Sequence, residues 1–279
     1  MSRTAFVAPS PLPGFAPALG AALIWLGLLV LIPLGALIWR ASSIGLWGIL
    51  DIAAQPRVAA ALRLSFGLSL LAASLNVVLG GIVAWVLTRY EFPGRKLLDA
   101  AVDLPFALPT AVAGIALTAV YAPNGWLGAP LGELGIKVAF TPLGVFVALV
   151  FIGLPFMVRS VEPVLAEIDP EIEEASATLG ASRLRTIARV VLPPLLPAFL
   201  TGFALALARA VGEYGSVVFI SGNIPFFSEI APLLIVVRLE EFDEAGATAV
   251  ATIMLALSFA MLLIVNLAQA LVRRRTGYG

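Results

Sequence analysis

The chain has 279 residues, of which 17 are basic and 17 acidic, so its formal net charge is zero. Hydrophobic residues make up 61% of the chain and charged residues only 12%, against about a quarter in ordinary soluble domains. A soluble monomer of this size could not keep so much apolar side chain away from water. The composition therefore predicts an integral membrane protein.

The residue types that are missing exclude several kinds of chemistry. The chain has no Cys and no His, which rules out disulfides, thiolate nucleophiles, imidazole bases and His/Cys metal sites. Neither of its two lysines, Lys96 and Lys137, follows a glycine, so there is no G-x-x-x-x-G-K-[ST] loop to bind ATP. Without net positive charge the chain is also a poor partner for nucleic acid. We expect no catalytic residue, no cofactor and no metal site.

Uncharged runs of about 20 residues, the length that crosses a bilayer as a helix, predict the membrane segments. Five such runs are clear: Ala18–Trp39, Leu64–Thr88, Leu104–Tyr121, Val138–Val158 and Ala245–Val272. A sixth run, Pro193–Ile220, contains Arg209 and Glu213. The prediction is an all-α polytopic membrane protein with about six transmembrane helices.

The distribution of Lys and Arg favours six spans over seven. With six spans and the N-terminus inside, eleven basic residues lie on the cytosolic side and five outside. A seventh span within residues 214–237 changes these counts to nine and seven, which the positive-inside rule disfavours. Residues 221–244 are then expected to be external and partly amphipathic. We expect a cytosolic arm (1–17), a transmembrane domain (18–272) and a cytosolic basic tail (273–279).

The longest hydrophilic connection covers residues 159–192 and holds six of the 17 acidic residues. Asp169, followed by a proline, predicts the start of a helix, and Gly180 predicts its end. Ser182 is placed to cap a second helix over Arg183–Val191, which Leu-Pro-Pro then stops or bends. On these signals alone, the segment is either a solvated hairpin between two spans or a surface presented to the cytosol. Its net negative charge disfavours a DNA-binding helix-turn-helix.

This hydrophilic segment resembles the EAA motif of ABC importer permeases, E-A-A-x3-G-x9-I-x-L-P. Seven residues carry the resemblance, with Ser in place of the second Ala and Val in place of Ile: Glu174, Ala175, Ser176, Gly180, Val190, Leu192 and Pro193. The resemblance implies the architecture of a type I ABC importer permease, in which this loop is a coupling helix that docks on a separate cytosolic ATPase subunit.

Arg209 and Glu213 are spaced i, i+4 within the sixth run, so they share a helix face and can pair. Two interpretations are open. The pair is either structural, or it lines a solute pathway, because ionisable residues inside a membrane usually face the bundle interior or a water-filled cavity. In the second case Arg209 would lower the barrier for an anion and Glu213 would prevent tight trapping.

The residues around this pair resemble the R-x-x-G-E-[FY]-G … G-N-I-P pattern of sulfate- and molybdate-type oxyanion permeases. Further stretches extend the resemblance to the CysT-type sulfate/thiosulfate family over essentially the whole chain: Thr88–Arg95, Asp103–Gly114 and Val237–Asp243. The candidate residues for a translocation pathway are then Arg209, Gly212, Glu213 and Asn223.

The resemblance implies a permease subunit in the bacterial inner membrane, with both termini in the cytoplasm. Its implied partners are cytosolic ABC ATPase subunits, a second homologous permease subunit in a heterodimer, and a periplasmic sulfate/thiosulfate-binding protein. Molybdate or tungstate stays open as the anion, because similar short motifs recur in molybdate permeases. Two other classes are an ion-coupled secondary anion transporter that uses Glu213 and a structural membrane protein with a partner-binding loop. The lack of a convincing internal repeat disfavours the former.

Overall fold

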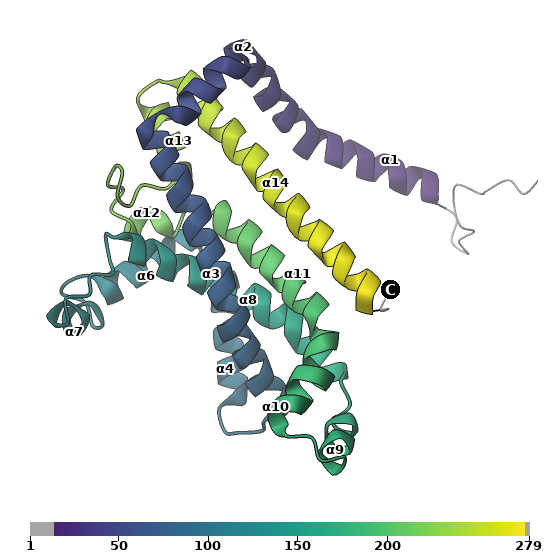
Figure 1. The fold of residues 1–279 in the computed structure, drawn as a ribbon. Helices are drawn as coiled ribbons and strands as arrows, with labels where there is room; N and C mark the ends of the chain where they lie inside the picture. Colours follow the sequence, from purple (N-terminus) through teal and green to yellow (C-terminus); the bar gives the residue numbers. More distant parts are fainter. Residues whose placement is uncertain (1–13, 277–279) are drawn as a thin grey trace, which may run out of the picture.

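The computed structural model describes residues 14–276 and contains helices and connecting turns, with no strand in that range (Figure 1). In this part of the chain five helices are long and apolar enough to cross a membrane: Phe15–Ala54, Pro56–Arg89, Pro142–Glu167, Arg183–Val211 and Glu244–Leu271. They correspond to five of the six expected spans. The prediction of an all-α polytopic membrane protein is confirmed.

Three helices cross at one buried methionine to form the centre of the bundle: α3 (Pro56–Arg89), α8 (Pro142–Glu167) and α11 (Leu192–Val211). Met157 of α8 is fully buried, with Gly80 of α3 and Gly202 of α11 against it. A Cβ added at Gly80 would lie 2.6 Å from Met157 Cγ, and one at Gly202 would lie 2.8 Å from its Sδ. The missing side chains therefore let the three helices approach closely.

This contact makes Gly80→Val a strongly destabilising substitution. The new side chain overlaps Met157, and overpacking a close-packed interior costs about 1–3 kcal/mol. Thermal unfolding of the purified protein in detergent would measure the effect. Gly67→Val is the matched control, because Gly67 lies on the same helix, is exposed and has no atom within 4 Å of an added Cβ. Equal melting temperatures for the two variants would contradict the packing argument.

The first long segment lies largely apart from this centre. It comprises α1 (Phe15–Leu26), a π-helical turn (Gly27–Leu31) and α2 (Ile32–Ala54), which packs beside α14 (Glu244–Thr276). No residue of α1 is buried, and Figure 1 shows α1 extending away from the other helices. Of the expected arm 1–17, residues 1–13 lie outside the described residues, as do residues 277–279 of the expected tail 273–279.

The third expected span, Leu104–Tyr121, is not one continuous helix. Helix α4 (Arg95–Val102) precedes it. The expected span itself consists of two helices, α5 (Leu104–Ala107) and α6 (Thr110–Tyr121), and Leu108 and Pro109 connect them in extended conformation. Proline lacks an N–H for the helix and disfavours helical geometry in the residue before it. A short α7 (Gly128–Glu133) then leads toward α8.

The expected span Pro193–Ile220 is not one continuous helix. Helix α11 stops at Val211 instead of Ile220, and α12 (Val217–Ile220) follows after a turn. The following segment, 221–244, is partly helical and partly buried in the protein. It contains α13 (Ala231–Glu240), whose Ala231 and Leu234 are buried among side chains of α3, α11 and α14. The apolar run 230–237 therefore contributes to the core, although it is too short to cross a membrane.

The hydrophilic connection 159–192 is shorter than the sequence predicts, because helices on both sides extend into it. Helix α8 continues to Glu167, and only α9 (Pro170–Thr178) stands between it and α10 (Arg183–Thr186). The second helix does not stop at Leu-Pro-Pro: α10 runs through a π-helical turn (Ile187–Val191) into α11. Pro193 and Pro194 cannot donate to the preceding turn, and a widened turn just before them accommodates their rings.

Candidate functional site

Helix α9 begins and ends where the sequence predicts. The Asp169 carboxylate caps it by accepting a hydrogen bond from the Glu171 N–H at 3.0 Å. At the other end Gly180 has φ 81°, and the N–H groups of Gly180 and Ala181 donate to Ala177 and Ser176 carbonyls. This left-handed glycine turn reverses the chain into α10.

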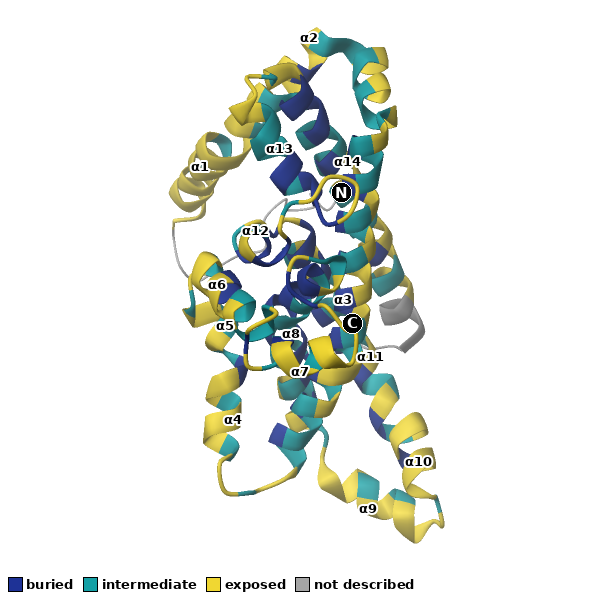
Figure 2. Ribbon diagram, turned by 90° about the vertical axis from the view of Figure 1, so that its left-hand side faces the viewer, coloured by how far each residue is buried: buried dark blue, intermediate teal, exposed yellow. Residues whose placement is uncertain are grey.

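The residues of the E-A-S-x3-G-x9-V-x-L-P pattern occupy α9, its glycine turn and the start of α11. Glu174 and Ala175 are exposed, Val190 lies in the π-helical turn, and Leu192 and Pro193 begin α11. Ala175, Ser176 and Val190 line a hollow of about 390 Å³ between the two helices. Helix α9 lies at the end of the bundle seen in the lower part of Figure 2, where it is mostly exposed, whereas Leu192 lines a separate hollow between α3 and α11.

Two leucines beside the glycine turn add apolar area to this exposed end of the bundle. Leu179 is 88% exposed and Leu184 is 80% exposed. Sequence reasoning did not single them out, although two apolar residues around Gly180 in a hydrophilic segment were a usable signal. Exposed apolar side chains grouped at a projecting turn are typical of a surface that another protein covers.

Polar contacts help to hold helix α9 on the rest of the chain, and none of its residues is fully buried. Ser176 Oγ and Thr186 Oγ1 are 2.9 Å apart and join α9 to α10. Ser182, expected to cap the second helix, makes no capping hydrogen bond through its side chain. The serine in the alanine position of the pattern therefore has a structural use that the sequence did not indicate.

The second attachment of α9 is Arg89, the last residue of α3. Its Nη2 lies 2.7 Å from Glu173 Oε1 on α9, and its Nη1 and Nη2 both donate to the Ile168 carbonyl at 3.2 Å. The guanidinium also lies over the Trp85 ring, 5.9 Å from its centroid. Trp85, Arg89 and Glu173 line a hollow of about 430 Å³ beside α9.

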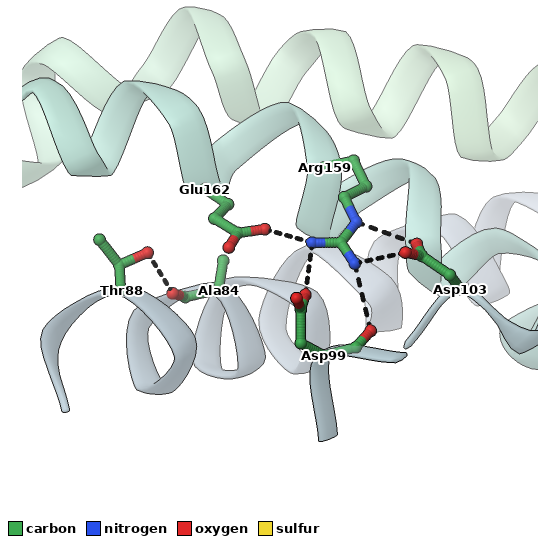
Figure 3. A network of polar contacts seen from close by, with 6 residues as sticks. All are labelled: Ala84, Thr88, Asp99, Asp103, Arg159 and Glu162. Carbon is green, nitrogen blue, oxygen red and sulfur yellow. Dashed lines mark hydrogen bonds and ion pairs between the residues drawn. The ribbon is translucent and has the colours of Figure 1, made fainter. Parts of the chain in front are cut away.

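A separate network fixes α4 and α5 to α8 at the same end of the bundle (Figure 3). Arg159 of α8 donates to both carboxylate oxygens of Asp103, at 2.9 and 2.7 Å, and contacts Asp99 at 2.7 Å and Glu162 at 2.6 Å. The two aspartates are spaced i, i+4 on the segment that leads into α5, so both face the same arginine.

Arg209 and Glu213 form the ion pair that their spacing predicts. Glu213 is 2% exposed, and its Oε1 also accepts hydrogen bonds from the Ser216 N–H at 2.7 Å and the Ser216 hydroxyl at 2.9 Å. Arg209 has a third of its side chain exposed. The carboxylate is therefore enclosed and fully partnered, whereas the guanidinium keeps an open face.

The turn that encloses Glu213 packs closely on α6. A Cβ added at Gly114 would lie 2.4 Å from the Ser216 carbonyl oxygen, and one at Gly215 would lie 2.1 Å from Thr110 Oγ1. Gly212, at the end of α11, is exposed and has no neighbour closer than 4.0 Å. Of the pathway candidates, the structure thus brings Arg209, Gly212 and Glu213 together.

Asn223 lies in the connection between α12 and α13, outside the ion pair. Its backbone N–H donates to Ser221 Oγ at 3.2 Å, and its side-chain oxygen is buried with no hydrogen-bond partner. The connection contains three residues with positive φ: Gly222, Asn223 and Phe226. Such strained backbone is costly away from glycine and often occurs at functional sites.

Carboxylates do not gather into a metal site here. Within the described residues, no group of three or more His, Cys, Asp or Glu side chains is placed to hold a metal ion. Asp169 caps a helix, and the other carboxylates in the networks above each contact an arginine: Asp99, Asp103, Glu162, Glu173 and Glu213.

Comparison with known proteins gives a consistent result. Residues 76–278 match the family model described as binding-protein-dependent transport system inner membrane component. The chain is 47% identical over 264 residues to the sulfate transport system permease protein CysT of Salmonella typhimurium, covering 95% of each chain. It is 52% identical over 248 residues to a probable sulfate transport system permease protein of Nephroselmis olivacea, covering 89% of this chain and 87% of the relative.

The fold is also found in a solved transporter of low sequence identity. A chain of a bacterial alginate ABC transporter, crystallised in complex with an alginate pentasaccharide-bound periplasmic protein, superposes with a TM-score of 0.77 at 17% identity over 95% of both chains. This likeness supports the expected architecture of an ABC importer permease. The chain belongs to the family of binding-protein-dependent transport system inner membrane components, among its CysT-type permeases.

Proposed function

We propose that the chain is a membrane-spanning subunit of an ATP-driven importer and that its substrate is sulfate or the chemically similar thiosulfate. The observation that carries this proposal is the exposed α9–Gly180–α10 surface with its E-A-S-x3-G-x9-V-x-L-P residues, in a chain whose relatives are named sulfate permeases. Because the sequence has no P-loop, ATP hydrolysis belongs to a separate ATPase subunit.

In this proposal α9 is the coupling helix. Glu174 offers an exposed carboxylate for a charge-assisted hydrogen bond to the ATPase. Leu179 and Leu184 supply the apolar area that the ATPase would cover. The small residues Ala175 and Ser176 let a partner come close to the α9 backbone. A periplasmic binding protein and a second, homologous permease subunit complete the proposed assembly.

The proposed anion pathway passes Arg209. Glu213 is enclosed by Arg209 and Ser216, so it orients the guanidinium and does not itself face the solute. Exposed Gly212 leaves room beside the arginine. The unpartnered amide oxygen of Asn223 is a further polar group in the connection that follows.

The proposed topology places the α9 end of the bundle in the cytoplasm of a bacterial cell. Arg89, Arg95, Lys96 and Arg159 lie at or near that end, which agrees with the positive-inside rule. Helix α14 runs toward the same end in Figure 1. A reporter enzyme that folds only in the cytoplasm should therefore be active when it is fused to the C-terminus. A fusion that is active only in the periplasm would contradict this orientation.

Uptake by the reconstituted complex tests the function. The chain, its candidate partner permease, the ATPase and the binding protein should import radiolabelled sulfate into liposomes only when ATP is present. Unlabelled sulfate or thiosulfate should compete, and molybdate should compete weakly. Uptake by the purified chain alone under a proton or sodium gradient would contradict the proposal and identify a secondary transporter instead.

A further inference from the structure

Helix α3 carries one arginine in each of its terminal turns, and each arginine holds a carboxylate from a different part of the chain. Arg57, in the first turn, pairs with Glu229, which precedes α13. Arg89, the last residue, pairs with Glu173 on α9. The two arginines are separated by 32 helical steps, about 48 Å at 1.5 Å per residue.

The contact at the Arg57 end is a two-point clamp. Arg57 Nε donates to Glu229 Oε2 at 2.8 Å and its Nη2 donates to Oε1 at 2.7 Å. The Glu229 side chain is only 1% exposed. Ser65, two turns further along α3, accepts a hydrogen bond from the Ala231 N–H at 2.8 Å. The segment 221–230, with its strained backbone at Phe226, is thus fixed to α3.

The contact at the Arg89 end combines an ion pair with hydrogen bonds to a backbone carbonyl. The guanidinium reaches both the Glu173 carboxylate and the Ile168 carbonyl, so it holds the start of α9 and the connection before it. Helix α9 has no fully buried residue, so polar contacts contribute more to its position than they do for the core helices. Its contacts with Arg89 and Thr186 connect it to α3 and to α10.

Helix α3 is suited to join these two ends mechanically. It is continuous, and its only proline is Pro56 at its start. Its neighbours are continuous helices too, but they carry internal prolines: Pro155 and Pro163 in α8 and Pro197 in α11, which also follows a π-helical turn. Prolines and π-helical turns are the usual places where helices bend. On this ground we expect α3 to bend less than α8 or α11 when α9 is displaced.

We propose that α3 is the link between the coupling helix α9 and segment 221–230, and that Arg57 and Arg89 are the positioning residues at its two ends. Movement of α9 would displace Arg89 and with it α3. At the other end of α3, the Arg57–Glu229 contact would then displace segment 221–230, which contains Asn223. This inference rests on the proposed function, because it assigns a role in coupling ATP hydrolysis to anion movement.

The test measures sulfate imported per ATP hydrolysed by the reconstituted complex. For Arg89→Gln and Arg57→Gln we expect retained co-purification with the ATPase and continued ATP hydrolysis, but a ratio reduced about fivefold or more, typical of the loss of a coupling interaction. The charge exchange Arg89→Glu with Glu173→Arg should restore part of the ratio. Arg40→Gln is the matched control, because the Arg40–Glu244 pair is about two-thirds exposed on both sides.

Two results would overturn the inference. One is a parallel loss of uptake and hydrolysis with an unchanged ratio, which is what a merely structural role predicts. The other is a fully additive effect in the Arg57→Gln/Arg89→Gln double variant, because two ends of one link should not act independently. If Arg57→Gln fails to assemble, Arg57→Lys keeps the charge and loses the two-point clamp, and the same criteria apply. Failure of the unaltered complex to import sulfate would instead overturn the proposed function.

Discussion

We expect Gly180→Val to insert into the membrane normally and to lose the ATPase subunit during purification. Gly180 adopts φ 81° at the turn between α9 and α10, a conformation that costs an L-residue about 1–2 kcal/mol and disfavours β-branched side chains further. An added Cβ meets no atom within 4 Å, so the effect arises from the backbone and not from a clash. Relief of the strain turns α9 away from α10.

The expected loss of co-purified ATPase is about tenfold or more, because about 1.4 kcal/mol already changes an equilibrium constant tenfold. Gly180→Asn is the control, since asparagine tolerates the left-handed region better than other L-residues. It should retain the ATPase. A normal amount of ATPase bound to Gly180→Val would show that the glycine turn does not position the docking surface.

The second large effect is expected at Arg209. Removing this side chain alone would leave the enclosed Glu213 carboxylate without its cation, which is destabilising. We therefore compare Glu213→Gln with the double variant Arg209→Ala/Glu213→Gln. The amide group introduced by Glu213→Gln keeps an acceptor oxygen for Ser216, so this single variant should assemble and keep most of the uptake.

The double variant should assemble equally well and import sulfate about tenfold more slowly or worse. The reason is the loss of a charge-assisted contact with the anion, worth about 1.5–3 kcal/mol. ATP-dependent uptake into liposomes measures the difference, and size-exclusion chromatography of the complex checks assembly. Equal uptake by the two variants would assign Arg209 and Glu213 a structural role only.

Local signals in the sequence predicted the helix boundaries that depend on single residues. Asp169 and Gly180 begin and end α9 as expected, because a cap and a left-handed glycine act within one turn of the backbone. The Arg209–Glu213 pair also formed, since i, i+4 spacing on a helix is a local property. Hydropathy alone predicted one continuous span over Leu104–Tyr121, but the helix is broken at Pro109.

Contacts between distant segments decided the rest. The apolar run Pro193–Ile220 did not reveal that Glu213 closes a turn with Ser216, or that this turn packs on Gly114 of α6. Nor did charge counting show that residues of α13 are buried among α3 and α14. An uncharged sequence segment has the same hydropathy whether lipid or protein surrounds it, so only packing distinguishes the two.

The sequence by itself determined that the chain is a polytopic helical membrane protein with an exposed, capped helix between two spans, because apolar length and capping residues act locally. Only the tertiary structure decided which partners the charged residues take. In both pairs, Arg57 with Glu229 and Arg89 with Glu173, the two residues are far apart in the sequence. They meet because α3 extends from one end of the bundle to the other and carries an arginine at each end. Pairing of this kind depends on how helices pack, which local spacing does not encode.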